Sequence, residues 1–174
     1  MTAETLGDVF IVDDNPNNLN LLASILRGGG YRVRMSNSGR RGLGMVEAHP
    51  PDLVMLDITM PELDGYQVCA ELRAREATRH IPVIFISALD DPVAKLRAFQ
   101  DGGADYVTKP FQSEEVLARV ENQLRTVRLR RQLERREAEL AAAYETVRRS
   151  EEELRRAREE IARLLAGLGS STDS

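Results

Sequence analysis

Five short stretches rich in apolar residues alternate, over the first two thirds of the chain, with stretches whose apolar residues recur every three or four positions. The five cover residues 8–12, 31–35, 53–56, 81–86 and 104–107. Apolar runs of this length between turn-forming residues predict buried strands, and the spacing between them predicts amphipathic helices. Five such strand–helix repeats predict an α/β fold, with a doubly wound parallel sheet covered by helices on both faces.

The helices expected between the strands begin and end at recognisable residues. Pro16 suits the first turn of a helix that stops at Gly28, and helices are also expected over 39–48 and about 63–75. The fourth helix is expected to have a cap at Asp90 or Asp91, Pro92 in its first turn, and three residues that face the core, Val93, Leu96 and Phe99.

The last helix does not stop where a compact domain would need it to. Neither proline nor glycine occurs between Pro110 and Gly167, so one helix from about Ser113 would be about 80 Å long. Its first apolar residues, Val116, Leu117, Val120 and Leu124, are expected to cover the sheet. We therefore expect a compact α/β domain over residues 1–125, with its core at about 7–125, a coiled-coil extension over 126–168 and a flexible tail over 169–174.

From Leu133 onward the apolar residues of this helix recur every seven positions. They are Leu133, Leu140, Val147, Leu154, Ile161 and Leu168. A seven-residue repeat predicts a left-handed coiled coil, so a second copy of the chain is implied. The positions three residues later are Arg136, Ala143, Ser150, Ala157 and Leu164, and four of these five are small or polar. We expect a weak parallel homodimer, although Glu153 facing Arg158 is the only good pair for that direction.

Charge and composition narrow the classes of function. Residues 1–111 hold 15 acidic and 11 basic side chains, whereas the helical remainder is neutral overall, so neither part resembles a nucleic-acid surface. The basic stretch 125–131 lacks the base-reading segment of a basic-region zipper, and no direct nucleic-acid binding is expected. Cys69 is the only cysteine, which is typical of a reducing cytoplasm. No apolar run approaches the roughly 18 residues that would predict a membrane span.

Residues able to do chemistry follow the ends of several predicted strands. Asp13 and Asp14 follow the first strand, Asp57 ends the third and Ser87 ends the fourth. In the common strand order 2-1-3-4-5, the first and third strands are neighbours, which brings the three carboxylates together. Carboxylates this close repel one another unless a cation joins them, and an oxygen-only cluster suits Mg²⁺. Taken alone, Asp13 or Asp14 would more often be a helix cap, and Ser87 could be another.

Four motifs together identify a family that the chain resembles. They are Val12-Asp13-Asp14, Leu56-Asp57-Ile58-Thr59-Met60-Pro61 with Asp64-Gly65, Ile86-Ser87-Ala88, and Ala104-Asp105-Tyr106-Val107-Thr108-Lys109-Pro110. In this order, each at a strand end, they resemble the CheY-like receiver domain of two-component response regulators of bacterial signalling. The resemblance covers about residues 7–125 and implies the flavodoxin-like (βα)5 fold.

The resemblance also implies a role for each matching residue. Asp57 would accept a phosphoryl group from the phosphohistidine of a histidine kinase or phosphotransfer protein. Mg²⁺, or Mn²⁺ in its place, would be held by Asp13, Asp14, Asp57 and the backbone carbonyl of Thr59. Lys109 would pair with a phosphoryl oxygen, Ser87 and Tyr106 would form the switch, and the Lys109–Pro110 peptide would be cis. Tyr106 could instead be ordinary sheet packing.

On this interpretation the chain is not a separate enzyme, because it would catalyse only its own phosphorylation and dephosphorylation. The signal would pass through the dimeric coiled-coil helix to an output. Two alternatives remain open from the sequence. The chain could be the first part of a longer signalling enzyme, such as a hybrid histidine kinase or a nucleotide cyclase. It could also be a constitutive coiled-coil scaffold whose receiver is inactive.

Overall fold

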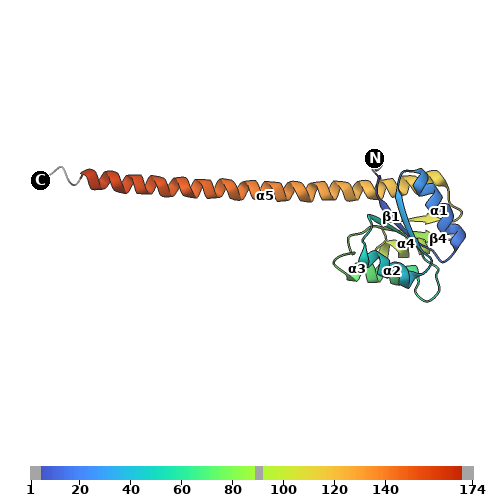
Figure 1. Ribbon diagram of the computed structural model, residues 1–174. Coiled ribbons are helices and arrows are strands. Elements are labelled where there is room, and N and C mark those ends of the chain that lie inside the picture. Colours follow the sequence, from blue (N-terminus) through green and yellow to red (C-terminus); the bar gives the residue numbers. More distant parts are fainter. Residues whose placement is uncertain (1–4, 89–91, 170–174) are drawn as a thin grey trace. The chain divides into compact units, whose positions relative to one another are not determined.

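The computed structural model describes residues 5–88 and 92–169, which form five strands and five helices in strict alternation (Figure 1). In chain order they are β1 (Asp8–Val12), α1 (Pro16–Gly28), β2 (Arg32–Ser36), α2 (Gly39–Ala48), β3 (Leu53–Asp57), α3 (Gly65–Ala74), β4 (Val83–Ser87), α4 (Pro92–Gln100), β5 (Asp105–Thr108) and α5 (Ser113–Gly169). The alternation predicted from the apolar pattern is confirmed.

All five strands are parallel, and their order in the sheet is β2-β1-β3-β4-β5. This is the predicted doubly wound order. The register pairs Val12 of β1 with Leu56 of β3, and Asp57 of β3 with Ile86 of β4. The carboxyl ends of β1 and β3 therefore lie side by side. Ligands bind at this end of the strands in open α/β folds.

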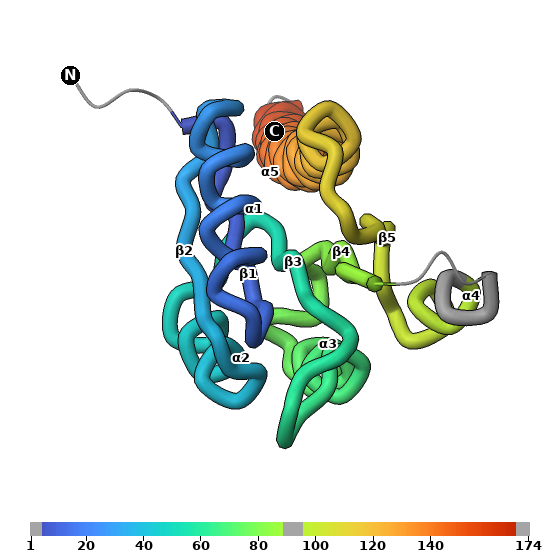
Figure 2. Tube along the Cα trace, turned by 90° about the vertical axis from the view of Figure 1, so that its right-hand side faces the viewer, coloured from blue at the N-terminus to red at the C-terminus, as the bar shows by residue number. Residues whose placement is uncertain are grey.

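Each face of the sheet has its own apolar core. On one face, residues of α1 and of the first turns of α5 pack on Val9, Ile11 and Met55. On the other face, residues of α2 and α3 pack on Phe10, Leu56 and their neighbours. Figure 2 shows the same division, with α2 and α3 together and α1 near the start of α5. Because both faces are covered, every residue of β3 and β4 is buried.

The prediction for α4 is wrong in part. Leu96 and Phe99, expected in the core, are 60% and 49% exposed, whereas Ala98 is buried. The helix lies beside the edge strand β5 (Figure 2), where only a narrow stripe can be covered. The Phe99 ring packs edge-on against Tyr106 instead, with ring centroids 6.0 Å apart. The expected cap at Asp90 or Asp91 and the side chain of Val93 lie outside the described residues.

The first turns of α5 are fastened to the domain by a group of polar contacts. The Tyr31 hydroxyl donates a hydrogen bond to Glu121 at 2.8 Å, and Arg128 donates to the other Glu121 oxygen at 2.7 Å and to the Leu6 carbonyl at 3.2 Å. Burial, followed by the hydrogen bond and charge of Glu121, raises the pKa of Tyr31 to about 12. The phenol therefore stays a donor, so this link persists across the neutral pH range.

Two glycines let apolar side chains of α5 come close to the domain. A Cβ on Gly29 would meet the Leu117 side chain at 2.5 Å, and one on Gly7 would meet the Leu124 side chain at 3.0 Å. Val116, Val120 and Leu124 are buried and Leu117 is partly buried, as predicted.

The chain divides into two compact units, Met1–Arg128 and Leu129–Ser174, and α5 belongs to both. Every side chain of 129–169 is exposed, including the apolar ones of the seven-residue repeat, which are 54–71% exposed. Among the residues that the structure describes, no helix is long and apolar enough to cross a bilayer. An apolar stripe of this length on a single helix lacks the partner surface that such stripes normally bury.

Two glycines provide a matched test of the packing. A Cβ on Gly65, the first residue of α3, would collide with the backbone of Asp57 and Ile58, whereas one on Gly44 in α2 would meet nothing within 4 Å. We expect Gly65→Ala to lower the free energy of unfolding by about 1–3 kcal/mol and Gly44→Ala to raise it by about 0.5–1 kcal/mol. Urea unfolding of both variants measures this, and an equal effect at the two positions would contradict the fold at the β3–α3 connection.

Candidate functional site

Three carboxylates meet where β1 and β3 end. One oxygen each of Asp13, Asp14 and Asp57 lie within 4.8 Å of one another. Asp13 and Asp57 are buried, at 0% and 3% exposure, whereas Asp14 is exposed to solvent. The pairing of β1 with β3 produces this cluster, because it places residues 13–14 and 57 at adjacent strand ends. Two buried acids and one exposed acid form a site that is anchored in the protein and open on one side.

Asp13 is held by more partners than any other member of the cluster. Its Oδ1 accepts a hydrogen bond from the Asn15 backbone N–H at 2.8 Å. The Asn18 side-chain amide donates to both of its oxygens, at 3.2 and 3.1 Å. Sequence analysis did not identify Asn18. The sequence shows an amide in the first turn of the helix that follows Asp13, but residue spacing alone does not show that it reaches the carboxylate.

Lys109 supplies the positive charge of the site. Its Nζ lies 3.1 Å from an oxygen of Asp13 and 3.1 Å from Oδ1 of Asp57. The Lys109–Pro110 peptide is cis, and the Lys109 backbone N–H donates to the Ser87 carbonyl at 2.8 Å. Burial alone would lower the pKa of Lys109, but the charges of Asp57 and Asp13 and their hydrogen bonds raise it above its ordinary value. The ammonium therefore remains charged.

The pKa of Asp57 is raised above its ordinary value, as is common for carboxylates in functional sites. Burial, and next the charge of Asp13, raise its pKa from 3.8 to about 6, although Lys109 acts in the opposite direction. The folded protein thus binds the Asp57 proton more tightly than the unfolded chain does. Ionised Asp57 costs folding free energy, and this cost is present at neutral pH and disappears as the pH falls below about 6. A cation beside the carboxylates would remove it.

The loop after β3 has a defined conformation. Asp64 caps α3 by accepting from the Gln67 backbone N–H at 2.8 Å, and Gln67 returns a bond to the Asp64 backbone. Glu62 takes a left-handed conformation, with φ 65°, at the tip. Thr59 is exposed two residues after Asp57, and within the described residues its carbonyl accepts no hydrogen bond. That carbonyl is therefore available as an oxygen ligand.

Ser87 and Tyr106 occupy different surroundings. Ser87 ends β4, one residue beyond the Ile86 that pairs with Asp57, and it is 9% exposed. Tyr106 is in β5 and packs between Phe99 and Arg119, whose guanidinium lies 5.1 Å from its ring centroid. The structure thus brings together Asp13, Asp14, Asp57 and Lys109, with Ser87 adjoining them through the Lys109 backbone. Tyr106 belongs to the neighbouring aromatic contact.

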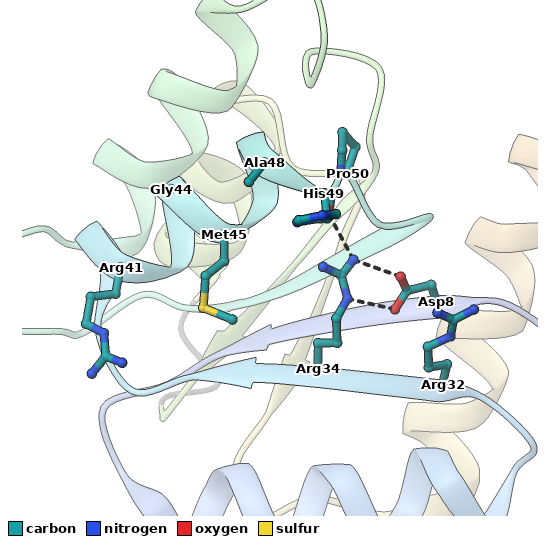
Figure 3. A pocket seen from close by; sticks show the side chains of 9 residues that line it. All are labelled: Asp8, Arg32, Arg34, Arg41, Gly44, Met45, Ala48, His49 and Pro50. Carbon is teal, nitrogen blue, oxygen red and sulfur yellow. Dashed lines mark hydrogen bonds and ion pairs between the residues drawn. The ribbon is translucent and has the colours of Figure 1, made fainter.

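A separate hollow of about 620 Å³ lies between β2 and α2 (Figure 3). Arg34 crosses it to Asp8, with which it makes two hydrogen bonds at 2.7 and 3.3 Å, and also donates to the His49 carbonyl at 2.9 Å. None of the carboxylates of the cluster lines this hollow. Its best-defined contact, between Arg34 and Asp8, ties the edge strand β2 to β1.

Comparisons with known proteins agree with this geometry. Residues 9–121 match the response regulator receiver domain family. The transcriptional regulator RpaA of Synechocystis is 41% identical over 117 residues, which are 67% of this chain and 48% of RpaA. The response regulator PleD of Caulobacter vibrioides is 35% identical over 130 residues, 75% of this chain and 29% of PleD. The chain thus spans less than half the length of these relatives.

Solved structures give the same result. A response regulator from Chloroflexus aurantiacus superposes with a TM-score of 0.66 at 36% identity, covering 68% of this chain and 97% of that one. The receiver domain of a histidine kinase from Syntrophus aciditrophicus gives a TM-score of 0.64 at 34% identity, covering 70% and 92%. With the family match over residues 9–121, these likenesses mean that the chain belongs to the response regulator receiver domain family.

Proposed function

We propose that Asp57 is the phosphoacceptor of a two-component system and takes its phosphoryl group from a phosphohistidine of a histidine kinase or phosphotransfer protein. One Asp57 oxygen would attack phosphorus as the bond from phosphorus to the imidazole nitrogen breaks. The observation that carries the proposal is Asp57 itself, buried at a strand end with a pKa of about 6 and 3.1 Å from Lys109. An ionised carboxylate with a fixed cation beside it is what phosphoryl transfer requires.

The donor set fits Mg²⁺, or Mn²⁺, which the family implies. Three carboxylates within 4.8 Å and the free Thr59 carbonyl are hard oxygen ligands, and the open side at Asp14 leaves room for water. Asp13, Asp14, Asp57 and Thr59 would hold the ion. When bound, it supplies positive charge that neutralises the transferring phosphoryl oxygens.

The remaining residues would act without changing covalently. Lys109 already bridges Asp13 and Asp57, and it would move one bond from a carboxylate to a phosphoryl oxygen. Asn18 and the Asn15 N–H keep Asp13 fixed during that change. The Ser87 hydroxyl at the adjacent strand end would donate to a second phosphoryl oxygen. Tyr106 would respond to that movement through its packing with Phe99.

The signal would leave the domain through α5, which begins in the first unit and forms the second. The exposed apolar stripe supports a homodimer through this helix. The small or charged residues between the large ones support a weak dimer, and phosphorylation would change how strongly the two copies associate.

The single, buried Cys69 supports a cytoplasmic location. A probable cyclic di-GMP phosphodiesterase of Vibrio cholerae shares only 29% of its length with this chain, which supports an attachment to a longer enzyme as the second candidate.

Metal binding and pH provide the first test. In chelator at pH 7, Asp57→Asn should raise the free energy of unfolding by about 1–3 kcal/mol, because it removes the cost of a buried charge. The gain should vanish as the pH falls through about 6 towards 3.8, where folded Asp57 is protonated. Millimolar Mg²⁺ should stabilise the unaltered protein and have much less effect on the variant.

Thermal and urea unfolding over pH 4–8, with and without Mg²⁺, measure these effects. Asp101→Asn, which removes an exposed carboxylate paired with Arg97, is the control and should behave as the unaltered protein does. Equal Mg²⁺ stabilisation of the Asp57 variant and the unaltered protein would count against the proposed ligand set.

Covalent chemistry provides the second test. Incubation with Mg²⁺ and acetyl phosphate should add one phosphoryl group, detected by intact mass, and Asp57→Asn should gain none. Lys109→Met should slow the reaction about 100-fold, as the loss of one oxyanion-stabilising donor typically does. Arg79→Met removes an exposed cation away from the cluster and is the control. A protein that gains no phosphoryl group under these conditions would be the inactive scaffold.

Association provides the third test. Leu154→Glu places charge in the apolar stripe and should raise the dimer dissociation constant more than about 100-fold, since two leucines lose their packing. Arg155→Glu changes the adjacent position outside the stripe and should leave association nearly unchanged. Sedimentation velocity with and without acetyl phosphate measures both effects. The same sedimentation for the two variants would remove the case for a coiled coil.

A further inference from the structure

The stripe on α5 consists of two interleaved series of side chains with unequal sizes. The large series is Leu133, Leu140, Val147, Leu154, Ile161 and Leu168. The small series is Leu129, Arg136, Ala143, Ser150, Ala157 and Leu164. Leu129, at 56% exposure, was not part of the stripe expected from the sequence, and it extends the small series to the first residue of the second unit. The small series is apolar and large only at its two ends.

In a parallel pair of helices, each residue of the stripe faces its own copy. Layers of two large apolar side chains would alternate with layers of two alanines at Ala143 and Ala157 and of two serines at Ser150. The thick layers hold the helices apart, so the thin layers leave voids. Arg136 would face Arg136 of the other copy across the seam, and like charges in that position repel. The parallel arrangement therefore has faults of packing and of charge.

In an antiparallel pair, residues of the large series face residues of the small series instead. With full overlap, the facing pairs are Leu133–Leu164, Leu140–Ala157, Val147–Ser150, Leu154–Ala143, Ile161–Arg136 and Leu168–Leu129. The central layers then combine one large and one small side chain, which gives a more even thickness. Every residue of both series has a partner in this register.

The charges beside the stripe fit the same register. In this register Arg136 would lie over Ile161 of the other copy, on the flank that would carry Glu139 of its own helix and Glu160 of the other. Its guanidinium thus separates two glutamates that would otherwise repel. On the opposite flank, Glu137 of each copy lies near Arg158 of the other, so the two-fold symmetry gives this ion pair twice. In place of a repulsion between arginines, each Arg136 gains acidic neighbours.

We propose that the occupant of this stripe is a second copy of the chain, running antiparallel in this register. The inference rests on the proposed homodimer and specifies its geometry. The helical segment 129–169 is about 60 Å long, enough for these six facing pairs, each of which the two-fold symmetry produces twice. In this dimer the two domains are attached at opposite ends of the coil, and Leu168 of each copy reaches the Leu129 at which the other copy's helix leaves its first unit.

Disulfide trapping distinguishes the two directions. The background is the 174-residue chain with the buried Cys69 replaced, Cys69→Ala, checked for unchanged sedimentation and circular dichroism. Into it we would introduce Ala143→Cys and, in a separate chain, Leu154→Cys. Oxidation by glutathione disulfide of each variant alone and of a refolded equimolar mixture is followed by non-reducing electrophoresis and mass spectrometry.

The antiparallel register expects a 143–154 disulfide in the mixture, at least about tenfold more abundant than either homodimeric disulfide, because only that pair meets the short Cβ separation a disulfide needs. A homodimeric 143–143 disulfide that dominates, in protein that sediments as a dimer, would overturn the direction while leaving the homodimer intact. Protein that sediments as a monomer at all concentrations tested would overturn the proposed homodimer itself. The two failures are therefore distinguishable.

Discussion

One lysine shared between two buried carboxylates is the interaction on which the site depends. Asp13 and Asp57 are brought together by the pairing of β1 with β3, and without Lys109 their charges would make that pairing expensive. The lysine reduces the cost but does not remove it, as the raised pKa of Asp57 indicates. Part of the electrostatic repulsion between Asp13 and Asp57 therefore remains in the folded protein. A cation or a phosphoryl group that changes the charge balance there acts directly on the folding free energy of the domain.

Much of this arrangement is readable from the sequence, because strand ends are marked by a change from apolar to acidic residues. Asp13, Asp14 and Asp57 could be grouped from the strand order alone, and Lys109 by its motif. Asn18 was missed, because its role depends on how far the first turn of α1 brings it towards Asp13, a distance that residue spacing does not give. The roles of Ser87 and Tyr106 stay predictions, since the structure gives their surroundings and not their movements.

The error in α4 has a similar origin. Periodicity locates an apolar stripe but does not say how wide a surface is available to cover it. A helix over the middle of a sheet buries a broad stripe, whereas α4, beside the edge strand β5, buries Ala98 and leaves Leu96 and Phe99 exposed. On α5 the same periodicity was informative for the opposite reason. The repeat continues beyond Arg128, into the second unit, and its side chains are exposed throughout the described part of that unit.

The base of α5 combines two kinds of restraint. Leu117 and Leu124 sit where Gly29 and Gly7 lack side chains, and Glu121 joins Tyr31 to Arg128. The two leucine side chains fit against the glycine backbone and so oppose movement of the helix along its axis. The hydrogen bonds of Glu121 oppose rotation of the helix about that axis. A helix restrained in both respects moves with the body that carries it. A displacement of the sheet or of α1 therefore carries with it the first turns of α5, up to Arg128.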